Sequence, residues 1–108
     1  MQADERKVLN LLGLAQKAGK AACGGFSAEQ AVKSGQAKIA VIATDASANT
    51  KIKFHNMCQW YHVPAIEFSE KASLGHCLGK EDKAVMAVTD AGLADAVLKA
   101  AGGVDTRR

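Results

Sequence analysis

The stretch KIAVIAT, residues 38–44, decides the fold of this 108-residue chain. It is a nearly continuous apolar run rich in valine and isoleucine, which is the pattern of a strand buried on both faces of a sheet. Such a strand belongs in the middle of a sheet whose two faces are covered by helices. We therefore expect an α/β protein with its central strand at residues 38–44.

The segments before this strand alternate between helix and strand patterns. Helical spacing of apolar residues predicts a helix over residues 4–18, closed by Gly19, and a short strand follows at 20–23. A second helical stripe, formed by Ala28, Ala31 and Val32, stops at Gly35. A helix, a strand and a second helix therefore precede the central strand.

The segments after it continue the alternation. Asp45 and Ser47 are candidate helix caps, and the apolar stripe of the helix that runs to His62 consists of Phe54, Met57, Cys58 and Tyr61. Pro64 ends that helix and begins a strand at 64–68. A helix at 69–78, a strand at 84–88 and a last helix capped by Thr89 or Asp90 complete the pattern. This order predicts a three-layer α/β/α sandwich.

The composition predicts one domain over residues 1–108, with a core at about 6–100 and a frayed tail from Gly102. A chain of this size can bury a core without a metal or a disulfide. Its three cysteines are odd in number and form no CxxC pair, which favours reduced thiols in a cytoplasm. No apolar run approaches the ~20 residues that span a bilayer. We expect a cytoplasmic monomer without a membrane partner.

The basic residues are concentrated in one part of the chain. Residues 17–53 contain six lysines against Glu29 and Asp45, whereas residues 54–106 contain four lysines against seven acids. A basic stretch of this kind favours a polyanionic partner, because neutralised phosphates release their counterions. The alternative is an ordinary solvated surface rich in lysine.

Residues 17–35, KAGKAACGGFSAEQAVKSG, contain the glycines and lysines of a candidate anion site. A phosphate-binding P-loop and a dinucleotide fingerprint both fail on spacing, which argues against nucleotide catalysis. What remains is a strand that leads into Gly24 and Gly25 at a helix start, where free amides and absent side chains admit a phosphate. Lys20 and Lys33 flank this pair.

Each of the other candidate residues has a structural alternative. Ser27 and Gln30 fit a capping box, and Phe26 either staples the helix start to the core or stacks on a base. His55, Cys58 and His62 share a helix but make a weak metal set, so we expect no metal and no cofactor. Trp60 and Tyr61 are adjacent, so one of them can be buried while the other faces solvent. No arrangement of side chains supports catalysis.

Several motifs in sequence order resemble a known family. KAGK at 17–20, a glycine near 24, AVKSGQAKIAVIATDAS at 31–47, CQWYHVP at 58–64 and LGHCLGKEDKAVMAVTD at 74–90 resemble the L7Ae/L30e superfamily of kink-turn RNA binders, and its bacterial YlxQ-type branch in particular. The resemblance covers residues 6 to about 100. It implies an α/β/α sandwich around a four-stranded mixed sheet.

The resemblance also implies where RNA is bound. Family members use the loop and helix start after the first strand, here Gly24 to Lys33, and the loop before the last strand, here Gly79 to Lys83, to recognise a sharply bent RNA by its shape. Strong kink-turn binders have Asn, Glu and Lys where this chain has Phe26, Ser27 and Gln30. They also have apolar residues in the second loop, where this chain has Lys80, Glu81 and Asp82.

These observations predict a non-catalytic, ribosome-associated protein that binds a structured, kink-turn-like RNA. Gly24 and Gly25 admit the RNA backbone; the expected phosphate contacts are Lys17, Lys20 and Lys33. Phe26, Ser27 and Gln30 face the bases; the second edge of the site is Lys80, Glu81 and Lys83. The alternative is a protein-interaction module that has kept the fold, lost RNA affinity, and uses Trp60 or the acidic second half.

Overall fold

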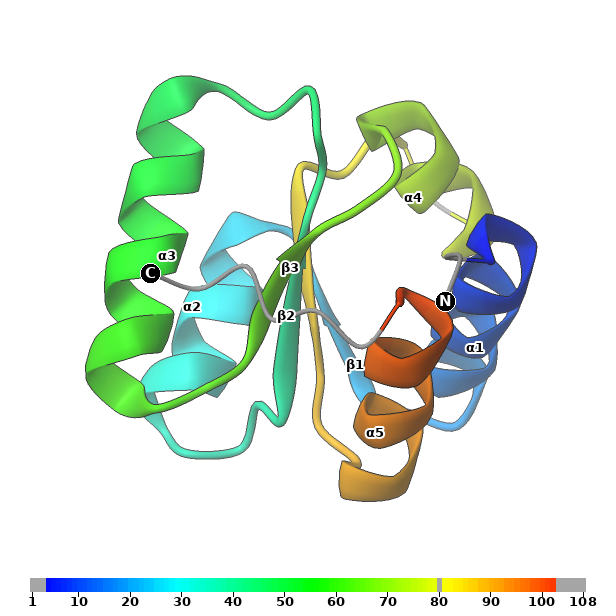
Figure 1. Cartoon of the computed structure of the whole chain (residues 1–108), viewed down its shortest axis with the longest axis horizontal. Helices are drawn as coiled ribbons and strands as arrows, with labels where there is room; N and C mark the ends of the chain where they lie inside the picture. Colours follow the sequence, from blue (N-terminus) through cyan, green and yellow to red (C-terminus); the bar gives the residue numbers. More distant parts are fainter. Residues whose placement is uncertain (1–3, 80, 103–108) are drawn as a thin grey trace.

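The computed structural model describes residues 4–79 and 81–102, and it contains nine helices and strands within those ranges (Figure 1). In chain order they are α1 (Glu5–Lys17), β1 (Ala21–Cys23), α2 (Gly25–Lys33), β2 (Ile39–Ile42), α3 (Ala48–Tyr61), β3 (Ala65–Glu67), α4 (Lys71–Cys77), β4 (Val85–Val88) and α5 (Ala91–Ala100). All the predicted helices and strands are present, although several are shorter than expected. The predicted frayed tail, apart from Gly102, lies outside the described residues.

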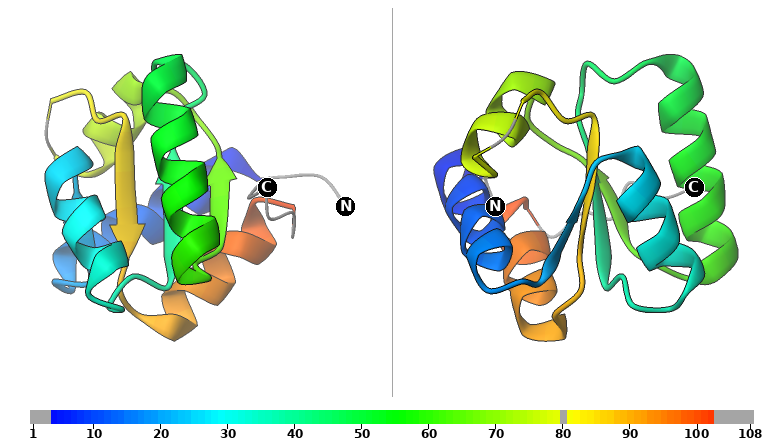
Figure 2. Two further views of the ribbon diagram at one scale, coloured as in Figure 1. Left: turned by 90° about the vertical axis from the view of Figure 1, so that its left-hand side faces the viewer. Right: turned by 180° about the vertical axis from the view of Figure 1, so that it is seen from behind.

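The strands form one mixed sheet in the order β1-β4-β2-β3. β4 pairs antiparallel with both β1 and β2, while β3 pairs parallel with β2. Helices α2 and α3 cover one face, and α1, α4 and α5 cover the other (Figures 1 and 2). The predicted α/β/α sandwich around a four-stranded mixed sheet is confirmed.

The core is centred on the two inner strands. Every residue of β2 and of β4 is buried, and the buried residues of all five helices join them in one apolar cluster. The continuous apolar run therefore marks a strand that is covered on both sides, as the sequence predicts.

The start of α4 differs from the prediction because of two local features. Ser69 adopts a left-handed conformation with φ of 65°, so the helix begins at Lys71 rather than at residue 69. The amide of Lys71 donates a hydrogen bond of 2.8 Å to the Asp45 carboxylate. Asp45, a predicted cap for the helix that follows it, therefore stabilises α4 instead, and Ser47 alone caps α3.

The pairing directions place one set of chain ends together. Because β1 and β2 are both antiparallel to β4, and β3 is parallel to β2, the carboxyl ends of β1, β2 and β3 lie at the same edge of the sheet. We call this the carboxyl edge; α2, α3 and α4 start from it, and the loop before β4 returns to it. The opposite, amino edge contains the ends of α1, α2 and α3.

One prediction about α3 is wrong. Tyr61 was expected in the buried apolar stripe, yet it is 40% exposed, and its neighbour Trp60 is 79% exposed. The helix ends at Tyr61 and His62 is left-handed, so the core is completed by Val63 instead, which is 5% exposed.

Candidate functional site

The glycine pair forms the turn between β1 and α2. Gly24 has φ of 91° and ψ of 164°, a conformation that is essentially restricted to glycine. Its amide donates to the Val85 carbonyl and its carbonyl accepts from the Ala28 amide, each at 2.9 Å, so the turn is fixed at both ends. Gly25 is exposed, and a Cβ there would have no neighbour within 4 Å.

The first amides of α2 are available to a ligand. Gly24 is the N-cap and no side chain caps the helix, so the capping box of Ser27 and Gln30 is wrong. The helix starts at Gly25, two residues earlier than a box at Ser27 requires, and Ser27 lies inside its first turn. The amide hydrogens of that first turn have no intrahelical acceptor and carry the positive end of the helix dipole.

Lys83 joins the loop before β4 to this turn. Its ammonium nitrogen would lie 3.8 Å from a Cβ on Gly24, and its amide donates to the Lys71 carbonyl at 3.1 Å. The two sequence segments that were predicted to form one site therefore meet at the carboxyl edge. Lys80 lies outside the described residues.

The loop around Glu81 is seated on α4. A Cβ on Gly75 would overlap the Glu81 carbonyl oxygen and would approach the Asp82 Cα to 2.8 Å. Glycine at 75 therefore permits the loop backbone to lie directly on the helix. The side chains of Glu81 and Asp82 are exposed, and with Glu70 they make the α4 side of the carboxyl edge acidic.

Three predicted base-facing residues share one groove. Phe26, Ser27 and Gln30 are exposed and line a hollow of about 480 Å³ between α2 and β1, the strand at the end of the sheet. The hollow continues along the small side chains of β1 to Gly19 and Gln36, near the amino edge. Phe26 is 78% exposed, so it does not staple the helix start to the core.

The predicted phosphate contacts Lys17, Lys20 and Lys33 lie near the amino edge instead. The three residues of β1 separate Lys20 from Gly24 by about 13 Å, and eight residues of α2 separate Lys33 from Gly25 by about 12 Å. Lys20 adjoins Gly19, at the far end of the groove, and Lys17 ends α1. The structure does not bring these three lysines to the glycine turn.

Lys33 is also held by an ion pair. Glu29 lies 2.7 Å from the Lys33 ammonium and 2.8 Å from that of Lys53 on α3. Hydrogen bonds from Lys33 and then Lys53 lower the pKa of Glu29 from 4.5 to about 2, and Glu29 in turn raises the pKa of Lys33. That Glu29 joins two helices could not be predicted from the sequence, because its partner Lys53 is 24 positions away.

The weak metal set is not brought together. His55 Nε2 lies 2.7 Å from a Glu67 carboxylate oxygen, Cys58 is fully buried, and His62 is exposed beyond the helix end. Across residues 4–79 and 81–102 there is no group of three metal-ligating side chains. Within the same ranges, no helix is long and apolar enough to cross a membrane.

A hollow larger than the groove lies away from the glycine turn. It measures about 720 Å³, runs between α1 and α4, and includes Lys17 alone among the predicted site residues. Its lining mixes charged and apolar side chains, such as Arg6, Leu14 and His76. Volume alone would select this hollow, but the geometry that suits a phosphate backbone is at the glycine turn.

Comparison with known proteins finds relatives that match most of the chain. The chain is 38% identical over 88 residues to "RNA-binding protein YlxQ" of Bacillus subtilis (strain 168), which covers 82% of this chain and 88% of the relative. It is 36% identical over 93 residues to the protein of the same name from Enterococcus faecium, with coverages of 86% and 89%.

Two solved structures have the same fold. One is a protein of unknown function from Bacillus halodurans C, with a TM-score of 0.85, 31% identity, and coverage of 89% of this chain and 97% of that one. The other is the Giardia lamblia 15.5kD RNA binding protein, with a TM-score of 0.77, 24% identity, and coverages of 99% and 94%. Residues 6–98 match the Ribosomal protein L7Ae/L30e/S12e/Gadd45 family, and the chain belongs to that family.

Proposed function

We propose that this protein binds RNA at the carboxyl edge and recognises a sharply bent, kink-turn-like element by its shape. The single observation that carries the proposal is the exposed Gly24–Gly25 turn at an uncapped helix start, with the Lys83 ammonium beside it. The curated relatives named as RNA-binding proteins support the same chemistry. No catalytic step is part of this proposal.

The RNA backbone would approach the glycine turn from the α2 side. Bare amides and the adjacent ammonium attract a phosphate there, whereas Glu70, Glu81 and Asp82 repel one on the α4 side. From the turn, an RNA strand could follow the groove past Phe26 to Gly19 at its far end, where Lys20 is the next residue in the chain. The carboxylate of Glu29 already holds Lys33, so Lys33 contributes less to this path.

Base recognition is expected to be weak. Phe26 offers a stacking surface, Ser27 one hydroxyl and Gln30 one carboxamide. They stand in place of the Asn, Glu and Lys that contact bases in the strong binders which this chain resembles. A lost bidentate contact costs about 1–3 kcal/mol of discrimination between bases. We therefore propose recognition of the bend, with ribosomal RNA as the target, by a monomer in the cytoplasm.

Titrations with three RNAs at two salt concentrations test the proposal: a kink-turn RNA, a straight duplex with the same base pairs, and a single strand. We expect the kink-turn RNA to bind most tightly. Lys83→Ala and Lys20→Ala should each flatten the dependence of log affinity on log salt by about 0.7–0.9. Lys33→Ala is the matched control, with a smaller effect because of Glu29.

Equal affinity for the bent and straight RNAs would show that the protein does not recognise the bend. An unchanged salt dependence in the Lys83→Ala protein would remove the carboxyl edge as the binding site. Gly25→Leu provides a second check. A Cβ at Gly25 meets open space, so we expect the variant to fold while its side chain blocks close approach of the RNA backbone; circular dichroism verifies the fold.

A further inference from the structure

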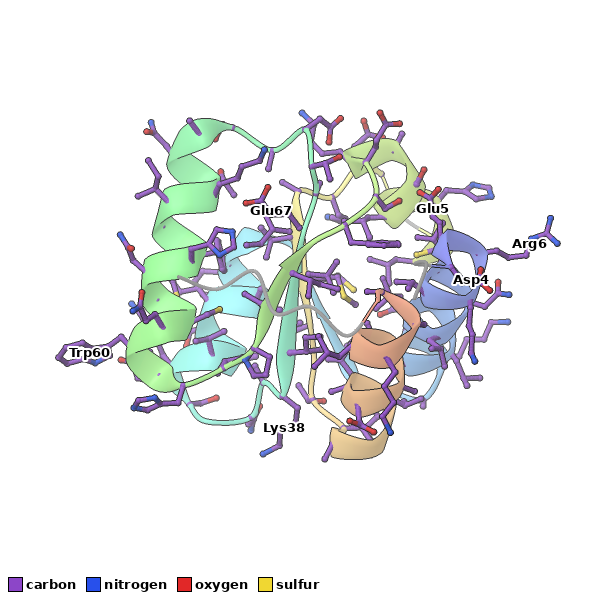
Figure 3. The ribbon with its side chains drawn as sticks, viewed as in Figure 1. Asp4, Glu5, Arg6, Lys38, Trp60 and Glu67 are labelled. Carbon is purple, nitrogen blue, oxygen red and sulfur yellow. The ribbon has the colours of Figure 1, made fainter. Side chains whose placement is uncertain are left out.

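The outer side of α3 contains a second feature that the carboxyl edge does not use. Trp60 is 79% exposed and projects away from the sheet (Figure 3). It lines an open hollow of about 540 Å³ together with Asn56, Gln59 and His62. His62 lies just beyond the end of α3 in a left-handed conformation, and its side chain lines the hollow.

The side chains of this hollow suit an unpaired nucleobase. An indole provides a flat stacking surface, and stacking on aromatic side chains is how proteins hold the bases of single strands. Carboxamides can pair with a base edge, and Asn or Gln pairs with adenine through two hydrogen bonds. Asn56 and Gln59 place two carboxamides beside the one indole of the chain.

The charge around the hollow favours a polyanion such as RNA over a basic or apolar surface of another protein. The residues of α3 include no carboxylate. Glu29 of α2 contacts Lys53 of α3 at 2.8 Å, so the two helices lie side by side. Glu29 pairs with both Lys33 and Lys53, which leaves one net positive charge where α2 packs on α3, while Lys51 pairs with Glu67. An RNA strand that extends from the carboxyl edge along α2 would meet this positive charge.

We propose that the hollow formed by Asn56, Gln59, Trp60 and His62 binds an unpaired base, preferably adenine, in a single-stranded RNA segment. The segment would be a flanking strand of the RNA that binds at the carboxyl edge. Trp60 is at the other end of α3, about 18 Å from its first residue. The two surfaces are therefore separate, and each can be tested without the other.

The fluorescence of Trp60 reports occupancy directly, because the chain has one tryptophan. We expect quenching by oligoadenylate, and by a kink-turn RNA that carries a single-stranded adenosine tail. The same kink-turn RNA with blunt ends should bind without quenching. Oligoadenylate that quenches while neither kink-turn RNA binds at the carboxyl edge would refute the proposed function and still support this inference.

Variants measured with fluorophore-labelled oligoadenylate complete the test. Trp60→Ala should weaken binding by about 5- to 100-fold, while Trp60→Phe keeps most of the affinity. Ile52→Ala is the matched control, since Ile52 is 59% exposed on the same helix and lies outside the hollow. Equal affinities of the Trp60→Ala and native proteins would overturn the inference. So would fluorescence that responds to protein concentration and not to RNA, because a second copy of the chain would then occupy the hollow.

Discussion

Gly24 shows how one residue fixes both the backbone and the access to it. Its positive φ lets the chain turn from β1 into α2 within a single residue, and the Lys83 ammonium lies beside it, where a Cβ would be 3.8 Å away. Gly25, by contrast, has helical geometry and open space around it. The two adjacent glycines therefore have different roles, one in folding and one in access.

This difference predicts opposite effects of the same substitution on stability. Gly24→Ala should lower the free energy of unfolding by about 1–3 kcal/mol, because alanine strongly disfavours this conformation. Gly25→Ala should leave it unchanged or raise it by up to about 1 kcal/mol, since alanine is the better helix former. Urea unfolding of the two variants measures both changes. Equal destabilisation would show that the assigned backbone geometry of this turn is incorrect.

The roles of serine, glutamine and lysine side chains were the hardest to predict from the sequence, because these residues occur in many structural contexts. The spacing of Ser27 and Gln30 satisfies a capping box, but a glycine with positive φ starts the helix two residues earlier. The i,i+4 spacing of Glu29 and Lys33 already indicates an ion pair, whereas the contact of Glu29 with Lys53 depends on how α2 and α3 pack. Spacing along the chain carries no information about the early helix start or the contact between the two helices.

At the scale of elements, Glu29 connects the two helices that cover one face of the sheet. Its side chain is 22% exposed and lies between Lys33 of its own helix and Lys53 of α3. Both ammonium groups favour the ionised carboxylate. The ion pair therefore stabilises the packing of α2 on α3 only while Glu29 is charged.

The pH dependence of stability follows from this contact. The pKa of Glu29 is lowered from 4.5 to about 2, so its contribution is fully present above pH 4.5 and is lost as the pH falls toward about 2. Glu29→Gln should therefore reduce the loss of stability over that range, as measured by unfolding at a series of pH values. Lys53→Gln should reduce it less, because Lys33 remains. Parallel curves for the native and Glu29→Gln proteins would contradict the assignment.

The type of each helix and strand was predictable from the sequence, whereas the residues at which each begins and ends were less predictable. Helical spacing, continuous apolar runs, and glycine or proline boundaries located all nine elements, because tertiary burial imposes the apolar patterns on the sequence. The start of α4 was placed too early, since the left-handed Ser69 and the bond from Lys71 to Asp45 depend on contacts 26 positions apart. Trp60 was recognised as a candidate contact, but its hollow depends on the left-handed turn at His62.

At the scale of the whole molecule, stability depends on two fully covered strands. Ile42 of β2 is completely buried, whereas Ile52 on α3 is 59% exposed. The three strands that run in one direction deliver three helix starts to the carboxyl edge, so the core and the candidate site share the same framework. The apolar run at 38–44 predicted this layered framework, because only a doubly covered strand tolerates such composition.

The same substitution at these two isoleucines should have very different effects. Ile42→Ala should lower the free energy of unfolding by about 2–5 kcal/mol through lost burial and a cavity, a large part of the about 5–15 kcal/mol typical of a domain. Ile52→Ala should change it by less than about 0.5 kcal/mol. Thermal unfolding followed by circular dichroism distinguishes the two. A similar drop in melting temperature for both variants would place Ile52 in a packed environment.

Gly75 sets a limit on how the segment after α4 can change. Since residues 81 and 82 rest on the helix with no space for even a methyl group, the number of residues between the helix and β4 is matched to the helix surface. Insertions or deletions there would lift Lys83 from its place or tilt α4. We therefore expect the loop before β4 to keep its length during evolution and to change only in its side chains.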